Sequence, residues 1–113
     1  MNTFVEAVLS QPFTIVPMPN TSPHDQENCA IARTLKGDLD AFNELVVKYQ
    51  NFAYGIAYRM LHSREAASDA VQDSFIKAFR ALSTFKNGSF KSWLARIVVN
   101  TCHDAIRIDR RMR

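Results

Sequence analysis

The chain has 113 residues, 47% of them hydrophobic and 22% charged, which is typical of one ordinary globular domain with a single core. Its net charge of +3 is unevenly distributed: residues 1–82 carry seven Lys/Arg and nine Asp/Glu, whereas residues 83–113 carry seven Lys/Arg and two Asp/Glu. The basic C-terminal part predicts an acidic partner, most often nucleic acid, and the lack of a long apolar run argues against a membrane-spanning protein.

The N-terminal sequence and the cysteines indicate the cellular compartment in which the protein is expected. No basic residue precedes the short apolar stretch at the start of the chain, so the pattern is not that of a secretory signal. Cys29 and Cys102 are isolated thiols, which we interpret as reduced residues of the core or of a helix. We therefore expect a cytoplasmic protein.

Residues 1–24 are expected to form a flexible arm or linker ahead of a helical domain over residues 25–113. All four prolines lie between Gln11 and Pro23, and this density of prolines is incompatible with a helix. Nothing in the arm suggests a chemical role.

Two helices are predicted in the first part of the domain. Asp25 can cap a short leading helix that ends before Gly37, a residue suited to the turn after a helix. Asp38 can cap a longer helix, in which apolar residues recur at three- and four-residue spacing to about Leu61. Its aromatic side chains are most simply explained as core residues.

A third helix is predicted from Arg64, capped by Ser63, to about Leu82. Its apolar face would comprise Ala67, Ala70, Val71, Ser74, Phe75, Ala78, Phe79 and Leu82. The opposite face is acidic at the start, with Glu65, Asp69, Gln72 and Asp73, and basic at the end, with Lys77 and Arg80. This order either complements the helix dipole or forms a docking face for a basic partner, and the sequence leaves both interpretations open.

The segment from Ser83 to Gly88 is predicted to be a polar loop that ends in an Asn-Gly turn signal. Phe85 lies inside it and is either exposed for function or inserted into the core. Ser89 then caps a fourth helix that runs toward Arg113 without Gly or Pro.

This fourth helix separates into two faces at 3.6 residues per turn. The core-facing stripe would comprise Phe90, Leu94, Ile97, Val98, Thr101, Ala105, Ile108 and Met112. The polar face would comprise Arg96, Asn100, His103, Asp104, Arg107 and Arg111, with Arg110 at its edge and Trp93 near the boundary. Guanidinium groups can neutralise phosphates, an Asn amide can pair with a base edge and an indole can stack on a base, although a basic face can also simply be solvated.

No feature of the sequence favours an enzyme. It contains no predicted strand, no glycine-rich phosphate loop and no activated nucleophile. The three histidines have no Cys or carboxylate at metal-ligand spacing, and the neighbours Cys102 and His103 point in different directions on a helix. We expect no catalytic residue, metal or cofactor.

Several stretches, in this order and spacing, resemble region 2 of a bacterial RNA polymerase sigma factor of the extracytoplasmic-function (ECF) type in the sigma-70 family. They are residues 37–42, 57–61 and 69–75, then Phe85, residues 90–97, Asn100, Asp104 and Arg107. These matches lie within residues 37–113, about two-thirds of the chain. Each stretch alone is a weak signal, but their combination is specific.

The resemblance implies an all-α bundle of three main helices plus a short leading one. It implies docking on the clamp helices of the largest RNA polymerase subunit through Asp69, Gln72 and Asp73. It also implies recognition and melting of the minus-ten promoter element, with a flipped base of the non-template strand held by the loop. The residues expected to bind DNA are Phe85, Lys86, Asn87, Gly88, Ser89, Trp93, Arg96, Asn100, Arg107, Arg110 and Arg111.

Asp104 also matches a family position, and we expect it to orient Arg107 or a neighbouring cap, because phosphate would repel its carboxylate. An inhibitory anti-sigma factor is a further expected partner. The family usually has a second, helix-turn-helix domain, so we expect this chain to be a fragment or a truncated form of such a protein. The alternative function is a helical regulator that binds the polymerase or another protein without reading DNA.

Overall fold

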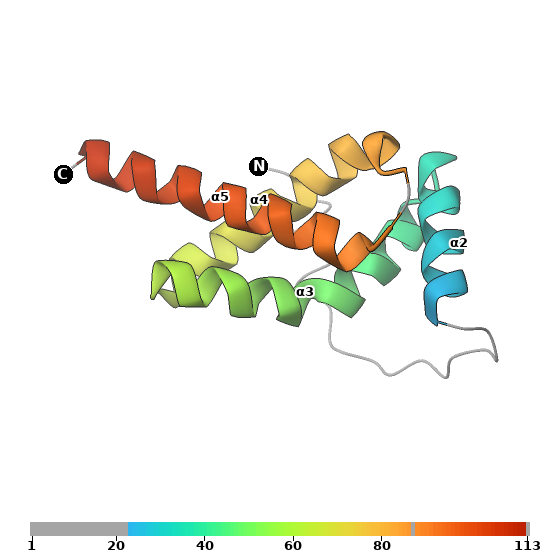
Figure 1. Cartoon of the computed structure of the whole chain (residues 1–113), viewed down its shortest axis with the longest axis horizontal. Coiled ribbons are helices and arrows are strands. Elements are labelled where there is room, and N and C mark those ends of the chain that lie inside the picture. The colour runs from blue at the N-terminus through green and yellow to red at the C-terminus, as the bar shows by residue number, and fades with distance from the viewer. Residues whose placement is uncertain (1–22, 87, 113) are drawn as a thin grey trace. The chain divides into compact units, whose positions relative to one another are not determined.

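The computed structural model describes residues 23–86 and 88–112 (Figure 1). Within them the elements are α2 (Pro23–Leu35), α3 (Leu39–Leu61), α4 (Arg64–Ala81), the 3-10 helix η1 (Leu82–Thr84) and α5 (Phe90–Met112). The described ranges contain no strand, so the predicted all-α class with three long helices and a short leading one is confirmed. The predicted arm lies outside the described residues up to residue 22, as does Asn87. None of the helices in the described ranges is both long enough and apolar enough to cross a membrane.

The start of the leading helix differs from the prediction. α2 begins at Pro23, so Asp25 lies in its first turn and is not its cap. A proline is favoured at the first position of a helix because its missing N–H would have no partner within the helix there. The prediction that Pro23 belongs to a non-helical segment is therefore wrong.

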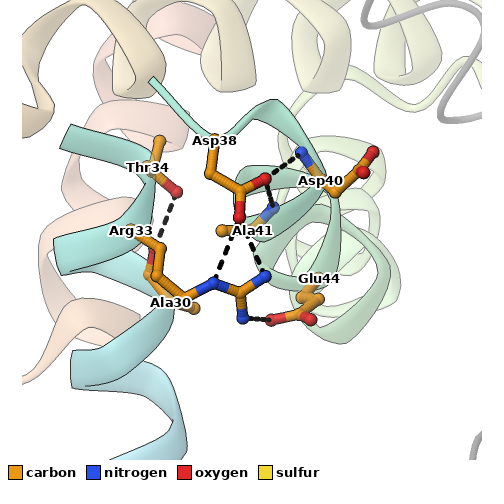
Figure 2. Close-up of polar contacts among 7 residues, drawn as sticks. All are labelled: Ala30, Arg33, Thr34, Asp38, Asp40, Ala41 and Glu44. Atoms are coloured by element: carbon orange, nitrogen blue, oxygen red, sulfur yellow. Dashed lines mark hydrogen bonds and ion pairs between the residues drawn. The ribbon is translucent and has the colours of Figure 1, made fainter. Parts of the chain in front are cut away.

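The chain forms two units, residues 1–48 and residues 49–113, and the boundary lies within α3. In the first unit, the junction between α2 and α3 follows the prediction (Figure 2). The amides of Gly37 and Asp38 donate to the carbonyls of Thr34 (2.9 Å) and Arg33 (3.1 Å), and Gly37 has a φ of 103° that favours glycine. This hydrogen-bond pattern ends α2 and turns the chain directly into α3.

Asp38 caps α3 as predicted, because its Oδ1 accepts from the backbone amides of Asp40 (3.1 Å) and Ala41 (3.3 Å). Its other oxygen accepts two hydrogen bonds from the guanidinium of Arg33, at 3.1 and 2.9 Å. The second terminal nitrogen of Arg33 lies 3.6 Å from Glu44 Oε2. The Arg33 guanidinium holds the pKa of Asp38 below its usual value.

In the second unit α4 and α5 pack against each other, and Figure 1 shows α5, in orange to red, crossing α4. Their caps are those predicted: Ser63 Oγ accepts from Ala66 N (3.2 Å) and Ser89 Oγ from Ser92 N (3.1 Å). The buried residues of the two helices are Ala67, Ala70, Val71, Ser74, Phe75 and Ala78 of α4 and Phe90, Leu94, Val98, Thr101 and Cys102 of α5. The three small alanines of α4 leave room for the larger side chains of a neighbouring helix.

The predicted core stripe of α5 is correct only in its first part. Ile97 and Ala105 are half-buried, whereas Ile108 and Met112 are 56% and 83% exposed. Burial depends on what packs against a helix as well as on its own periodicity, so the stripe continues in sequence beyond the point where it is covered. Ile108 and Met112 are therefore not core residues of the described structure.

Candidate nucleic-acid interface and docking face

Three aromatic rings come together where the loop before α5 meets its first turns. The ring centroid of Phe85 lies 5.8 Å from that of Phe90 and 5.4 Å from that of Trp93, and Phe90 and Trp93 are 5.6 Å apart. Phe90 is buried, whereas Phe85 and Trp93 are half-buried. Phe85 is therefore neither fully exposed nor fully inserted into the core. Its ring packs on the core, and part of the ring stays accessible. We call Phe85, Phe90 and Trp93 the aromatic cluster.

The loop itself is more ordered at its start than the sequence suggested. Its first residues form η1, in which Thr84 Oγ1 donates to Ala81 O (2.6 Å) and Phe85 N donates to Leu82 O (3.1 Å). These bonds fix the backbone that carries Phe85. Beyond Phe85, the predicted binding residues Lys86, Gly88 and Ser89 are exposed.

The ring contacts extend from the aromatic cluster to α3, which the sequence did not predict. Tyr49 lies 5.4 Å from Phe90 and 6.4 Å from Phe52, centroid to centroid, and Lys91 Nζ lies 4.7 Å from the centroid of the Phe52 ring. Helical periodicity assigned Tyr49 and Phe52 to the core and gave no indication of which ring of another helix a lysine would meet. The positive charge of residues 83–113 and the place of Lys91 in the stretch 90–97 were the signals that could have drawn attention to it.

The predicted binding side chains of α5 beyond Trp93 all lie on its exposed side. Polar residues recur along this side at intervals of three or four residues: Arg96, Asn100, His103, Arg107 and Arg111. Arg110 lies beside them. Within the described ranges, Arg96, Arg110 and Arg111 take part in no ion pair, so their charges are available to an external anion.

Asp104 is the acidic residue within this face, and it contacts two cations. Its Oδ1 accepts a hydrogen bond from Arg107 Nη2, and its Oδ2 lies 3.8 Å from Lys77 Nζ of α4. Lys77 also donates to Thr101 Oγ1 at 3.2 Å. The contact with Arg107 is the one that the sequence predicted, whereas the link to α4 is new. Lys77 was interpreted only as a residue that suits the helix dipole.

The predicted docking residues lie on α4, away from its buried stripe. Asp69 and Asp73 are exposed and Gln72 is half-buried. Neither carboxylate forms an ion pair with any residue that the structure describes, in contrast to Asp104. The structure therefore brings the DNA-binding candidates together on the loop and α5, and the docking candidates together on α4.

The thiols and carboxylates suggest no further chemistry. No group of three or more His, Cys, Asp or Glu side chains within residues 23–86 and 88–112 is placed to hold a metal ion. Cys29 is exposed and Cys102 is buried, and burial raises the pKa of the Cys102 thiol. A raised thiol pKa disfavours the reactive thiolate at neutral pH.

The model of the family Sigma-70 region 2 matches residues 45–112, more than half of the chain. The chain belongs to the sigma-70 region 2 family. This sigma region 2 chain is 42% identical over 78 residues to the RNA polymerase sigma-H factor of Pseudomonas aeruginosa, a match that covers 68% of this chain and 40% of that protein. It is 49% identical over 72 residues to the ECF RNA polymerase sigma-E factor of Salmonella typhimurium, covering 63% of this chain and 37% of that protein.

The sigma region 2 chain thus spans about two-fifths of the length of these relatives. Among solved structures it resembles an NMR structure described as an engineered region 2 of sigmaE in complex with GTAAAA, with a TM-score of 0.74 and 39% sequence identity. That match covers 81% of this chain and 97% of the other. The resemblance to an ECF sigma factor is therefore confirmed.

Proposed function

We propose that this chain is the promoter-recognition domain of an ECF-type sigma factor, which docks on RNA polymerase and recognises and melts the minus-ten element. The observation that carries the proposal is the pair of half-buried rings, Phe85 and Trp93, beside a line of exposed arginines on α5. Membership of the sigma-70 region 2 family and the likeness to a sigmaE region 2 bound to GTAAAA support it.

The aromatic cluster is suited to stabilise an unstacked base. Flipping a base out of a duplex costs a few kcal/mol, and stacking a base on an aromatic side chain returns about 1–3 kcal/mol. The exposed parts of Phe85 and Trp93 offer such a surface, and residues 86–89 follow Phe85 directly in the sequence. Capture of the base from the non-template strand would make recognition and melting one event.

The polar face of α5 supplies two kinds of contact. Arg96, Arg107, Arg110 and Arg111 would neutralise phosphates, a contact that positions the strand without reading its sequence. The amide of Asn100 can donate and accept, so it can distinguish one base from another. Asp104 would hold Arg107 in place through the contact between their side chains.

The experiment that tests the DNA-binding proposal is a titration with single-stranded GTAAAA and with a scrambled strand of the same composition. Trp93 is the only tryptophan of the chain and belongs to the aromatic cluster, so its fluorescence reports binding there. Preferential, salt-dependent quenching by GTAAAA supports the proposal. Binding of a polymerase subunit without any binding of DNA would favour the alternative, a regulator that does not read sequence.

We further propose that Asp69, Gln72 and Asp73 dock on the clamp helices of the largest polymerase subunit. Two exposed carboxylates one helical turn apart, without an ion pair in the described ranges, suit a basic partner. Their position on α4 leaves the exposed side of α5 available to DNA.

Charge reversal tests this docking role. Asp73→Lys should weaken capture of purified clamp helices in a pull-down, because an attractive charge becomes a repulsive one. It should leave the affinity for single-stranded GTAAAA unchanged or slightly higher. Asp40→Lys, at an exposed acid of α3 outside the acidic face of α4, is the matched control with the same change of charge. Clamp-helix binding that survives Asp73→Lys at full strength would show that the docking residues are misassigned.

A further inference from the structure

Lys91 has an environment that the proposed function does not yet explain. Its ammonium lies over the face of the Phe52 ring, 4.7 Å from the centroid, while the residue as a whole is exposed. A ring face attracts a cation electrostatically, so Phe52 restricts where this long, flexible side chain places its charge. Lys91 takes part in no ion pair with a residue of the described ranges.

The helix dipole does not account for a lysine at this position. Lys91 is the second residue of α5, and a cation in the first turn of a helix opposes the helix dipole. The first turn of α3 carries Asp40, and that of α4 carries Glu65 beside Arg64, whereas the first turn of α5 has no acidic residue. Because Lys91 opposes the dipole of its own helix and forms no ion pair in the described ranges, its charge is available to an external anion.

Pairwise ring contacts connect Lys91 to the aromatic cluster. Phe52 contacts Tyr49, Tyr49 contacts Phe90, and Phe90 contacts Trp93, so a continuous row of rings leads from the proposed base-binding surface to the lysine. Phe90 and Lys91 are adjacent in sequence, whereas Lys91 and Trp93 are two residues apart and point to opposite sides of the first turn of α5. A strand that stacks a base on Trp93 and reaches Lys91 therefore crosses the N-terminal end of α5.

We propose that Lys91 binds a phosphate of the single strand next to the captured base, and that Phe52 is a positioning residue that holds the ammonium there. This inference rests on the proposed function, because the anion is the backbone of the same strand. It extends the interface from α5 to α3 and adds two residues that the sequence did not indicate.

Two variants test the phosphate contact. Lys91→Gln removes the charge, and Lys36→Gln is the matched control, an exposed lysine of the first unit with the same change of net charge. Lys91→Gln should weaken binding of single-stranded GTAAAA and of the scrambled strand by the same factor. It should also reduce the salt slope by roughly 0.7, so that raising salt from 50 to 200 mM weakens this variant about 2.5-fold less than the wild type. Lys91→Arg should retain the slope.

A double-mutant cycle tests the positioning role of Phe52. Phe52→Leu should weaken binding in the wild-type background and have no further effect in the Lys91→Gln background, because there is then no ammonium to position. A purely structural role would cost the same affinity in both backgrounds and would overturn the role of Phe52. Thermal unfolding followed by circular dichroism checks that each variant is folded.

The outcomes separate the inference from the proposed function. If Lys91→Gln binds DNA with the affinity and salt slope of Lys36→Gln while the wild type prefers GTAAAA, the inference is wrong and the proposed function stands. If the wild type shows no salt-dependent binding of single strands, the proposed function fails and this inference fails with it.

Discussion

Phe85 and Trp93 are half-buried, and this intermediate exposure determines what they can do. A fully buried ring could not meet a base, and a fully exposed ring would have no fixed orientation. Their contacts with buried Phe90 hold both rings while part of each surface stays accessible. The same two residues thus contribute to packing and can serve binding.

Asn100 and Arg107 should respond differently to truncation. Arg107→Ala would remove the proposed phosphate contact, so we expect weaker binding of every strand and a salt slope lower by about 0.7 to 1. Asn100→Ala would remove the proposed base contact, so we expect the preference for GTAAAA over the scrambled strand to fall by about 1–3 kcal/mol. Fluorescence titrations of both strands at several salt concentrations measure these quantities.

The melting temperature serves as the control for this comparison. Asn100 is exposed, so its loss should leave thermal stability nearly unchanged. A folded Asn100→Ala protein with the full preference for GTAAAA would contradict base reading by this residue and leave only a basic, non-specific face. A large drop in melting temperature would instead show that Asn100 serves the fold.

At the residue scale the sequence predicts contacts within an element better than contacts between elements. The pairing of Asp104 with Arg107, on one helix, is one of the two roles expected for Asp104, because phosphate would repel its carboxylate. The contacts of Lys77 with Thr101 and of Lys91 with Phe52 join different helices. They depend on how those helices pack, which helical periodicity does not specify.

At the element scale, the caps were the most reliable signal. Asp38, Ser63 and Ser89 each accept a backbone amide at the helix start that the sequence predicted, because a short polar side chain satisfies a donor that the helix leaves free. The start of α2 and the end of the core stripe of α5 were wrong. Predicting the start of α2 required recognising that a proline can be the first residue of a helix. Predicting the end of the core stripe of α5 required knowing where the elements that pack against α5 end.

The junction of α2 and α3 predicts a pH dependence of stability. The hydrogen bond from Arg33 is the main cause that lowers the pKa of Asp38 in the folded state. The stability that this carboxylate contributes is therefore fully present above its unfolded pKa of about 3.9 and is lost as the pH falls through the lower folded pKa. Asp38→Asn keeps a capping side chain but cannot pair as an anion with Arg33. Wild type should be more stable than Asp38→Asn at pH 6, and the difference should shrink below pH 4.

Urea unfolding at pH 3, 4, 5 and 6 measures this difference. Asp40→Asn is the control, because it removes a carboxylate from the same helix start without removing an ion pair. A gap between wild type and Asp38→Asn that stays constant down to pH 3 would show that the Arg33 contact does not contribute to stability.

At the scale of the whole molecule, the uneven charge distribution corresponds to separate surfaces. The exposed cations of the loop and α5 account for the positive C-terminal part, and Asp104 is the acidic residue set within the binding side of α5. The exposed acids Asp69 and Asp73 lie on α4 instead. This separation allows one small domain to contact a basic protein surface and a polyanionic strand at the same time.

The most direct test is the quenching of Trp93 fluorescence by three ligands: single-stranded GTAAAA, its scrambled counterpart, and GTAAAA within a longer, stable duplex. The account predicts saturable quenching with the highest affinity for single-stranded GTAAAA, because only a free base can stack on the aromatic cluster. It predicts weaker binding of the scrambled strand, little quenching by the duplex, and a loss of affinity as salt rises. Equal affinity for the cognate and scrambled single strands, or binding seen by anisotropy that leaves Trp93 fluorescence unchanged, would contradict it.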